Sequence, residues 1–279
     1  MPFKFDAVGR RTEPVEYTYT WKDTVLYALG IGAKADELDY LFEGRGPRVY
    51  PSFAVIPAFA PLRMALEATE GPFDKVVHGA QKVILHAPIP PAGTLRTTAI
   101  VEGIYDMKRM AQAIVKTETV DAASGAKLFD TEWSILYLGE GGFGGKSRPE
   151  DEKLAAPSRE PDFHIEEVTS PEQALLYRLS GDLNPLHADP QFPLVARFEG
   201  KPILHGLATF GYVTRAVIKG ACGGDATKIG SIAGRFARPV WPGQTLTTDA
   251  WIEGKKVFAR MSVKERNEVV LSHVVLGLV

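Results

Sequence analysis

The chain contains an internal repeat, and this repeat constrains the fold more than any other feature of the sequence. Residues 91–103 and 242–254 align without a gap and share seven identical positions. At almost the same offset, the tetrapeptide at 26–29 matches the one at 176–179 at three positions. Self-similarity at a fixed spacing indicates a duplicated structural unit. We therefore predict two similar units of roughly 130–150 residues each.

The composition between the repeats indicates a linker. Residues 139–145 are rich in glycine, and residues 146–161 are polar and contain prolines. Both features are typical of connecting segments. We predict an N-terminal unit at 1–138, a linker at 139–161 and a C-terminal unit at 162–279. We interpret the glycines at 141–145 as a turn, with a ligand-binding loop as the alternative, because an isolated glycine cluster is weak evidence for a ligand.

The sequence predicts the same order of helices and strands in both halves. In the second half we expect a helix at 170–179 that begins at Ser170, a proline-containing loop at 182–193, and a helix at 205–219 that Gly220 ends. Strands follow at 231–238, 245–253, 257–264 and 268–278. The first half repeats this with helices near 23–29 and 58–67 and strands within 75–138. The pattern predicts an α+β fold in which an antiparallel sheet wraps around a helix, twice in tandem.

Composition excludes several classes of function. The net charge is -2 and no long charged run occurs, which argues against nucleic acid or an anionic membrane surface as a partner. The apolar stretch at 269–279 is too short to cross a bilayer. The N-terminus lacks the apolar core of a signal peptide, the C-terminus is not a peroxisomal tail, and Cys222 is the single cysteine. We expect a free-standing cytosolic protein without a metal or other cofactor.

The loop at 180–187 carries the residues best suited to chemistry. Asp182 and His187 lie five residues apart, with Asn184 and Pro185 between them. A carboxylate and an imidazole that share one water can accept and deliver protons near neutral pH. Asn184 could orient the water or the carboxylate. The alternative is a plain surface turn, because Asp-x-Asn-Pro is also a common turn sequence.

The start of the long helix offers a second feature. His205 and Gly206 stand directly before its apolar positions. The first N–H groups of a helix lack intrahelical acceptors and favour negative charge, and glycine allows a ligand to approach closely. A thioester oxygen that gains charge during hydration needs such donors. The alternatives are a core or capping role for His205 and tight helix–sheet packing for Gly206.

These residues together resemble the signature of a known family. The segments 177–187 and 201–207, with 27–30, 77–79, 141–145 and 235–243, are similar to the MaoC-like, (R)-specific 2-enoyl-CoA hydratases. More specifically, the chain resembles the hydratase 2 domain of the peroxisomal multifunctional enzymes of fatty-acid β-oxidation. The resemblance implies a double hotdog fold, a homodimer, and reversible hydration of a trans-2-enoyl-CoA to a (3R)-3-hydroxyacyl-CoA.

The resemblance also implies roles for individual residues. Asp182 and His187 would be the acid/base pair, Asn184 would help to hold the water, and the Gly206 N–H would face the thioester oxygen. The acyl-CoA thioester would contact a further set of residues, of which Lys108 would meet the CoA phosphates: His78, Gly79, Lys108, Leu183, Pro185, Leu186 and Phe236.

The repeat predicts different functional roles for the two halves. When Tyr27 is placed on Tyr177, Gly32 falls opposite Asp182 and Glu37 opposite His187, so the first half lacks the catalytic pair. We expect one active site per chain, with the first half holding the substrate. The apolar stretch at 49–64 is the candidate lining of an acyl tunnel through Phe53, Ile56, Phe59 and Leu62, or else ordinary core.

Two other functions compete with this interpretation. The chain could be a specialised dehydratase of the same fold that acts on a branched, dicarboxylic or steroid-side-chain acyl-CoA, since the tunnel and not the loop sets that choice. It could also be a non-catalytic acyl-CoA-binding scaffold. The complete set of Asp182, Asn184 and His187 argues against the scaffold, because a silent protein has no need of all three.

Overall fold

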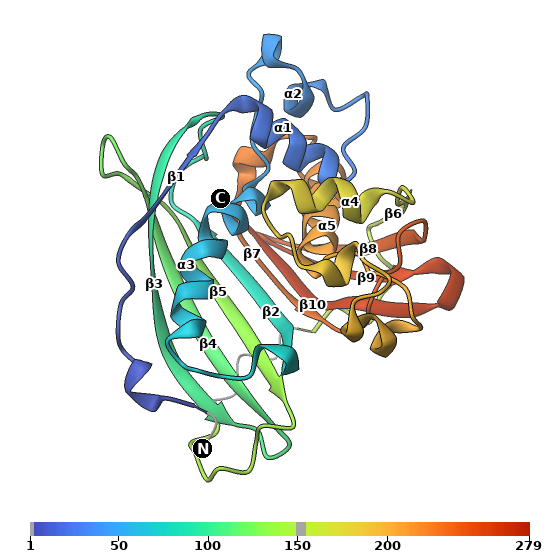
Figure 1. The fold of residues 1–279 in the computed structure, drawn as a ribbon. Helices are drawn as coiled ribbons and strands as arrows, with labels where there is room; N and C mark the ends of the chain where they lie inside the picture. Colours follow the sequence, from blue (N-terminus) through green and yellow to red (C-terminus); the bar gives the residue numbers. More distant parts are fainter. Residues whose placement is uncertain (1–2, 149–154) are drawn as a thin grey trace.

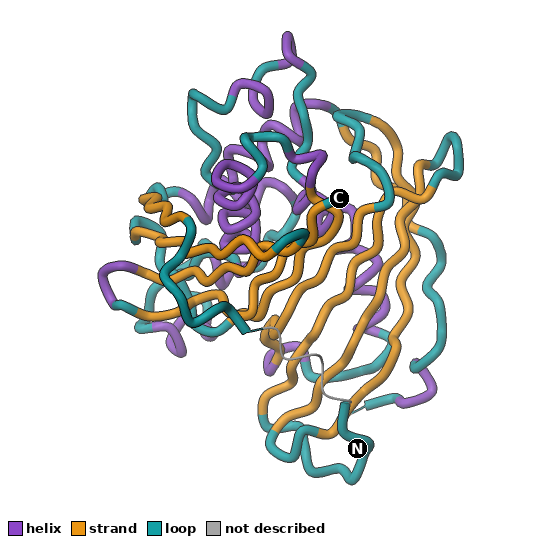
Figure 2. The backbone as a smooth tube through the Cα atoms, turned by 180° about the vertical axis from the view of Figure 1, so that it is seen from behind, coloured by secondary structure: helices purple, strands orange, loops and turns teal. Residues whose placement is uncertain are grey.

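A single antiparallel sheet of ten strands forms the frame of the protein. The computed structural model describes residues 3–148 and 155–279, and Figures 1 and 2 show the sheet from its two sides. Residues 149–154 of the predicted linker lie outside the described residues, and the unit boundaries at 138/139 and 161/162 stay a prediction. The strands are β1 (Val15–Tyr19), β2 (Val76–Leu85), β3 (Gly93–Asp106), β4 (Met110–Asp121), β5 (Lys127–Leu138), β6 (Phe163–Val168), β7 (Ile229–Phe236), β8 (Thr245–Glu253), β9 (Lys256–Val263) and β10 (Glu268–Leu278).

The order of the strands repeats the duplication of the sequence. The sheet runs β1-β3-β4-β5-β2 and continues β7-β10-β9-β8-β6, so each half contributes five strands in mirrored order. The halves meet where β2 pairs with β7, with Ala80 opposite Arg235 and Ile84 opposite Ser231. Ala80 and Ser231 are 151 residues apart (231 minus 80), as are Ile84 and Arg235, and this is also the spacing of the sequence repeat (242 minus 91). A local two-fold axis therefore passes through this pairing.

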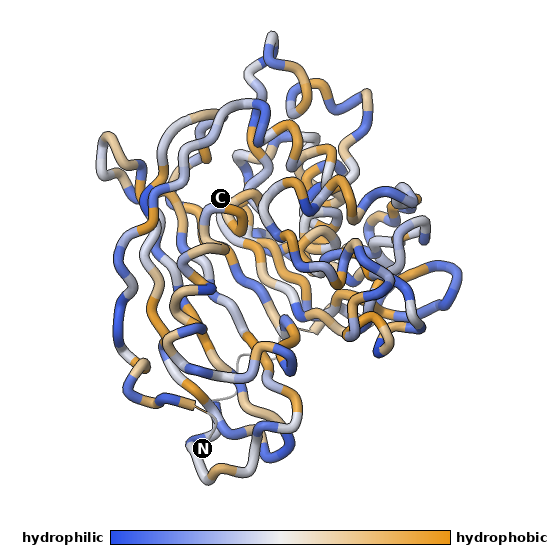
Figure 3. Tube along the Cα trace, in the orientation of Figure 1, coloured by the Kyte–Doolittle hydropathy of each residue, from blue (hydrophilic) through white to orange (hydrophobic). Residues whose placement is uncertain are grey.

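Helices cover one face of the sheet in each half. They are α1 (Trp21–Gly30), α2 (Leu38–Leu41), α3 (Val55–Glu67), α4 (Gln173–Tyr177) and α5 (Gly206–Ala221). α3 packs on β3, β4 and β5, and α5 packs on β7, β8, β9 and β10 (Figure 1). Twelve consecutive residues of α5, 207–218, are buried, and apolar residues gather where helices and sheet meet (Figure 3). Two helix-in-sheet units confirm the predicted α+β class. None of the helices in the described residues is long and apolar enough to span a membrane.

The repeated tyrosines join the two units. α1 and α4 lie side by side, and the rings of Tyr27 and Tyr177 pack with their centroids 6.0 Å apart. The Gln173 side chain donates from Nε2 to the carbonyls of Leu29 and Gly30, at 3.0 and 2.7 Å. Each contact crosses from one half to the other, so the segment that precedes the candidate loop is held by the first half.

A buried ion-pair network also crosses between the halves. Arg215 on α5 is 1% exposed, and its guanidinium contacts the carboxylates of Glu37 and Glu167 and the carbonyl of Ile31. The Tyr50 hydroxyl donates to the second oxygen of Glu37 at 2.7 Å. Glu37 is the residue that the repeat places opposite His187. In the first half this position is therefore part of a structural contact.

Two predicted helix ends were wrong. Gly220 lies inside α5, which ends at Ala221. A side chain at Gly220 would begin 2.5 Å from the Phe163 ring, so this glycine permits close packing, while Gly223 and Gly224 with positive φ turn the chain. α4 begins at Gln173, after its predicted start, because Ser170 accepts the Glu172 N–H in a turn before the helix.

Candidate active site

The loop after α4 is shaped by its polar side chains. The Asp182 carboxylate accepts the backbone N–H of Asn184 at 3.2 Å, and the Asn184 amide oxygen accepts that of Leu186 at 3.0 Å. These bonds lead into a short 3-10 helix at Pro185–His187. The turn interpretation of Asp182 and Asn184 thus describes the local geometry. It is compatible with a chemical role, because the same turns bring Asp182 and His187 to one point.

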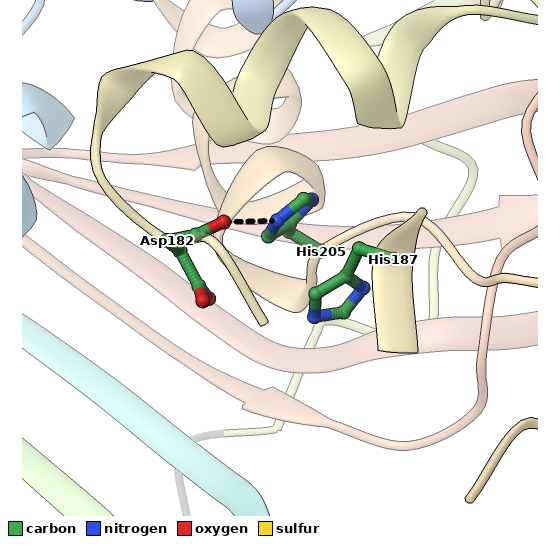
Figure 4. Close-up of side chains that lie close together, drawn as sticks. All are labelled: Asp182, His187 and His205. Atoms are coloured by element: carbon green, nitrogen blue, oxygen red, sulfur yellow. Dashed lines mark hydrogen bonds between the residues drawn. The ribbon is translucent and has the colours of Figure 1, made fainter. Parts of the chain in front are cut away.

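Asp182, His187 and His205 form a compact cluster. One carboxylate oxygen of Asp182 and one ring nitrogen of each histidine lie within 4.8 Å of one another (Figure 4). His187 Nδ1 lies 2.8 Å from the carbonyl oxygen of Ile203. A carbonyl only accepts, so Nδ1 carries the proton and Nε2 keeps its lone pair. Burial lowers the pKa of His187, with the nearby Asp182 carboxylate acting against it. His187 is therefore neutral at neutral pH, with a free lone pair on Nε2.

His205 contacts both other residues of the cluster. Its Nε2 donates to the backbone carbonyl of Asp182 at 3.1 Å, and its ring stacks on His187 with centroids 3.7 Å apart. Burial, and then the neighbouring His187, lower the pKa of His205 well below its usual value. A neutral His205 fixes the main chain of Asp182 without placing a positive charge beside His187.

The cluster has the composition of a metal site, yet its geometry favours acid/base chemistry. One carboxylate and two imidazoles are good ligands for divalent ions. His187 Nδ1 and His205 Nε2 are already bonded to carbonyls, which leaves one nitrogen on each ring. The rings stack with 25° between their planes, so a single ion cannot lie in both ring planes. We interpret the three residues as a proton-transfer site.

Gly206 begins α5 directly beside this cluster. Among the described residues, no acceptor lies within hydrogen-bonding distance of its N–H, as expected for the first residue of a helix. A Cβ at this position would lie 3.2 Å from the Phe236 ring. Gly206 therefore packs tightly on the sheet and leaves its N–H free beside His205, and its predicted role toward a thioester oxygen stays a prediction.

Aromatic rings from both halves continue from Gly206 into the first half. Phe236 on β7 contacts His78 on β2 with ring centroids 4.6 Å apart, and His78 stacks on Trp133 at 5.2 Å. Trp133 in turn lies 6.3 Å from Phe59 on α3. Burial lowers the pKa of His78 to about 4, so this wall is uncharged at neutral pH. Phe236 thus packs against Gly206 and His78 packs against Phe236, and their predicted contact with the acyl-CoA thioester stays a prediction.

Three buried polar atoms around the cluster lack a hydrogen-bond partner among the described residues. They are the Tyr177 hydroxyl, the Ser180 hydroxyl and His205 Nδ1. The Tyr177 ring lies 4.8 Å from that of His205. Buried polar groups are nearly always satisfied, so several unsatisfied ones together indicate a place where water or substrate polar atoms bind.

Lys108 and the glycine-rich segment contact the Asp106 carboxylate. The N–H groups of Lys108, Gly142 and Gly144 donate to the Asp106 carboxylate at 2.8 to 2.9 Å. The glycines at 141–145 therefore bind an anion that belongs to the chain itself. No contact among the described residues links Lys108 to the Asp182 cluster, and its predicted contact with CoA phosphates stays a prediction.

The remaining predicted residues fall into two groups. Leu183, Asn184 and Pro185 are exposed and Leu186 is half-buried, so they border the cluster from the solvent side. Gly79 forms the bulge in β2 that follows His78. Of the predicted tunnel residues, Phe53 and Leu62 are buried in the core, while Ile56 and Phe59 are only partly buried.

Sequence reasoning missed three contributors to the site. The Ile203 carbonyl sets the tautomer of His187, the Tyr177 ring packs on His205, and Trp133 extends the aromatic wall. Tyr177 stands in the quoted family segment, which was a usable signal. A backbone carbonyl leaves no trace in residue type, and Trp133 reads as a core residue of an alternating strand.

Known families match both halves of the chain. Residues 17–139 match the model described as "MFE-2 hydratase 2 N-terminal domain", and residues 152–273 match "MaoC like domain". The chain is 38% identical to "Enoyl-CoA hydratase 2, peroxisomal" of Arabidopsis thaliana, over 95% of this chain and 92% of that protein. It is 39% identical to "Enoyl-CoA hydratase ChsH3" of Mycobacterium tuberculosis, over 99% of both.

Solved structures agree with these matches. A MaoC-like dehydratase from Phytophthora capsici superposes with a TM-score of 0.88 at 31% identity, over 99% of this chain and 98% of that one. A Mycobacterium tuberculosis protein described as having a double hotdog fold superposes with a TM-score of 0.63 at 14% identity, over 99% and 97%. The second likeness concerns the fold alone, and it identifies the two helix-in-sheet units as a double hotdog.

Proposed function

The chain belongs to the family of MaoC-like hydratase 2 proteins, and from this premise we propose that it catalyses reversible addition of water to a trans-2-enoyl-CoA. The product is a (3R)-3-hydroxyacyl-CoA, formed in fatty-acid or related acyl-CoA metabolism. The observation that carries the proposal is the meeting of the Asp182 carboxylate, a neutral His187 with free Nε2, and the unpaired N–H of Gly206.

The geometry supports a definite sequence of proton movements. A water between Asp182 and His187 gives one proton to His187 Nε2, and its oxygen forms the bond to C3 of the enoyl group. The electron pair of the double bond moves toward the thioester oxygen, where the Gly206 N–H stabilises the developing charge. The imidazolium, stabilised by the Asp182 carboxylate, then returns the proton to C2. The sum is one water added, and no metal or redox cofactor is required.

The aromatic wall supports a path for the acyl chain. His78, Trp133 and Phe59 lead from Gly206 toward the half-buried face of α3, so we propose that the acyl group extends along them into the first half. Phe53 and Leu62 are packed in the core and take no part unless α3 shifts. This division of labour gives one reaction centre per chain, with the first half holding the substrate.

We also propose that the protein acts as a homodimer in the cytosol. The dimer follows from the family resemblance, and the location from a chain with one cysteine and an ordinary charge balance. A peroxisomal relative bears on the location, so fractionation of the native cells is the appropriate measurement. Light scattering on the purified protein tests the dimer, and a mass of one chain would contradict it.

The reaction is tested with a panel of trans-2-enoyl-CoA substrates. The panel contains straight-chain members of four to sixteen carbons and branched, dicarboxylic and steroid-side-chain members. Loss of the conjugated thioester absorbance reports hydration, and chiral separation identifies the product. We expect turnover with (3R)-3-hydroxyacyl-CoA as the product. Turnover restricted to branched, dicarboxylic or steroid-side-chain thioesters favours the specialised dehydratase. Tight binding without turnover of any substrate contradicts the proposal and favours the scaffold.

A further inference from the structure

The duplication places a counterpart of the candidate active site in the first half, and an apolar cavity lies at that position. The cavity has a volume of about 480 Å³ and lies between the halves. Its lining comes from residues within 46–51 and 85–91 of the first half, and from residues within 226–230 and Val279 of the second. At the spacing of 151 residues, its Leu85 corresponds to Phe236 and its Pro51 to Pro202. The cavity is thus related to the wall of the candidate active site by the local two-fold axis.

The correspondence extends across the seam between β2 and β7. Ile229 and Gly230 line the cavity and correspond to His78 and Gly79, which adjoin Phe236 in the candidate active site. In both places the wall is built from β2, β7 and the segment before a central helix. The same fold elements therefore form an apolar hollow twice, and only one copy contains Asp182 and His187.

The chemical groups are absent from the first-half copy. Gly32 replaces Asp182, and the Tyr212 ring occupies the space where a side chain at Gly32 would begin. Glu37 replaces His187 and is bound by Arg215 and Tyr50. Val55 stands where Gly206 stands in the second half, and its N–H is bonded to the carbonyls of residues 52 and 53. Among the described residues, this copy has neither the acid/base pair nor a free N–H at the position of Gly206, so it lacks the groups needed for hydration.

The lining specifies the class of ligand. It is mostly aliphatic and proline side chains, with the guanidinium of Arg48 among its few charges. The Arg48 guanidinium forms an ion pair with the Asp225 carboxylate at 3.6 Å. Arg48 is exposed and Asp225 is partly exposed, and such surface pairs contribute little, so the guanidinium can also contact an anion. The volume falls within the range of about 300–1,000 Å³ typical of small-molecule sites. An apolar chain with an anionic head fits both parts of this lining.

We propose that this cavity is a second, non-catalytic site for an acyl chain with an anionic head, either an acyl-CoA or a free fatty acid. The inference rests on the proposed function, because it takes the catalytic copy to be an acyl thioester site. Arg48 contacts the anionic head, and the chain lies against Leu85, Ile89 and Ile229. Ligand at this site occupies the interface between the halves without entering the reaction.

The test is calorimetric titration of the full-length protein with decanoyl-CoA, which has no double bond to hydrate, and separately with decanoate and with CoA. We expect two decanoyl-CoA per chain in the wild type. The Ala87→Phe variant, whose larger side chain fills the cavity, should bind one decanoyl-CoA per chain. It should keep the wild-type rate of hydration at low substrate concentration. Arg48→Gln should weaken the second site about tenfold, whereas Arg45→Gln, an exposed arginine of the same loop outside the lining, should not.

Each outcome bears on the proposal. Decanoate bound at the cavity with the affinity of decanoyl-CoA supports it and makes the free acid a ligand. One decanoyl-CoA per chain in the wild type, two in a folded Ala87→Phe variant, or CoA alone competing for the cavity overturns it. If the protein hydrates enoyl-CoA but binds only one decanoyl-CoA per chain, only this inference is overturned. Absence of hydration across the substrate panel overturns the proposed function instead, so the two failures are distinguishable.

Discussion

Removal of Arg215 is the perturbation whose effect on folding can be worked out most fully. Arg215→Met takes the cation from a buried network and leaves the carboxylates of Glu37 and Glu167, each 12% exposed, without their cationic partner. Breaking a buried ion pair in this way destabilises a protein by about 3–5 kcal/mol, because an uncompensated charge remains inside. Two carboxylates and the Ile31 carbonyl lose their donor together, so we expect the upper part of that range.

The assay is urea unfolding at pH 7 followed by circular dichroism. Arg215→Met combined with Glu37→Gln and Glu167→Gln should recover at least half of the loss, because no unpaired charge remains. Arg96→Met, which removes an exposed arginine paired with Glu16, should change stability by less than about 1 kcal/mol. The loss in Arg215→Met should shrink as the pH falls, because burial raises the pKa of Glu167 and this carboxyl then takes up a proton in the folded state. A loss below about 1 kcal/mol at pH 7 would refute this reasoning.

Two further predictions concern the candidate site. Gly206→Pro removes the N–H at a helix position that tolerates proline. The matched control, Gly206→Ala, adds a Cβ 3.2 Å from Phe236 and keeps the N–H. The kcat of Gly206→Pro should be about 10²–10³-fold below that of the control, and equal rates in the two variants would exclude the donor role. Because burial lowers the pKa of His187, kcat/KM should stay level near pH 7 and fall only as the pH is lowered below 6.5. If kcat/KM already falls while the pH is lowered from 8 to 7, a neutral His187 base is contradicted.

The duplication made the architecture predictable from sequence. Two strands, 245–253 and 268–278, were predicted with their observed bounds, because alternation and flanking turns mark them. The strands β1 and β6 were not predicted. Each is only five or six residues long, and each is a sheet edge whose pairing with β3 or β8 comes from outside its own segment. Gly220 shows the same limit, since its packing on Phe163 is a tertiary contact that a helix-end rule cannot detect.

The site was predictable to the level of its residue types. Asp182, His187 and Gly206 came from the loop, the helix start and the family resemblance, and the structure brings them together. The tautomer of His187 depends on the Ile203 carbonyl, and the stacking of His205 depends on how α5 meets the loop. Neither follows from residue identity. The cavity in the first half required the strand register as well, because only the β2–β7 pairing reveals the symmetry.

The most direct test of the central claim is the initial rate of crotonyl-CoA hydration by Asp182→Asn and His187→Ala. The matched control is Asp189→Asn, which alters an exposed aspartate of the same loop that likewise caps a backbone N–H. We expect each of the first two variants to lose about 10²–10⁴-fold in kcat, the usual contribution of acid/base groups, and the control to remain within about twofold of the wild type. Wild-type rates in both Asp182→Asn and His187→Ala would contradict the account.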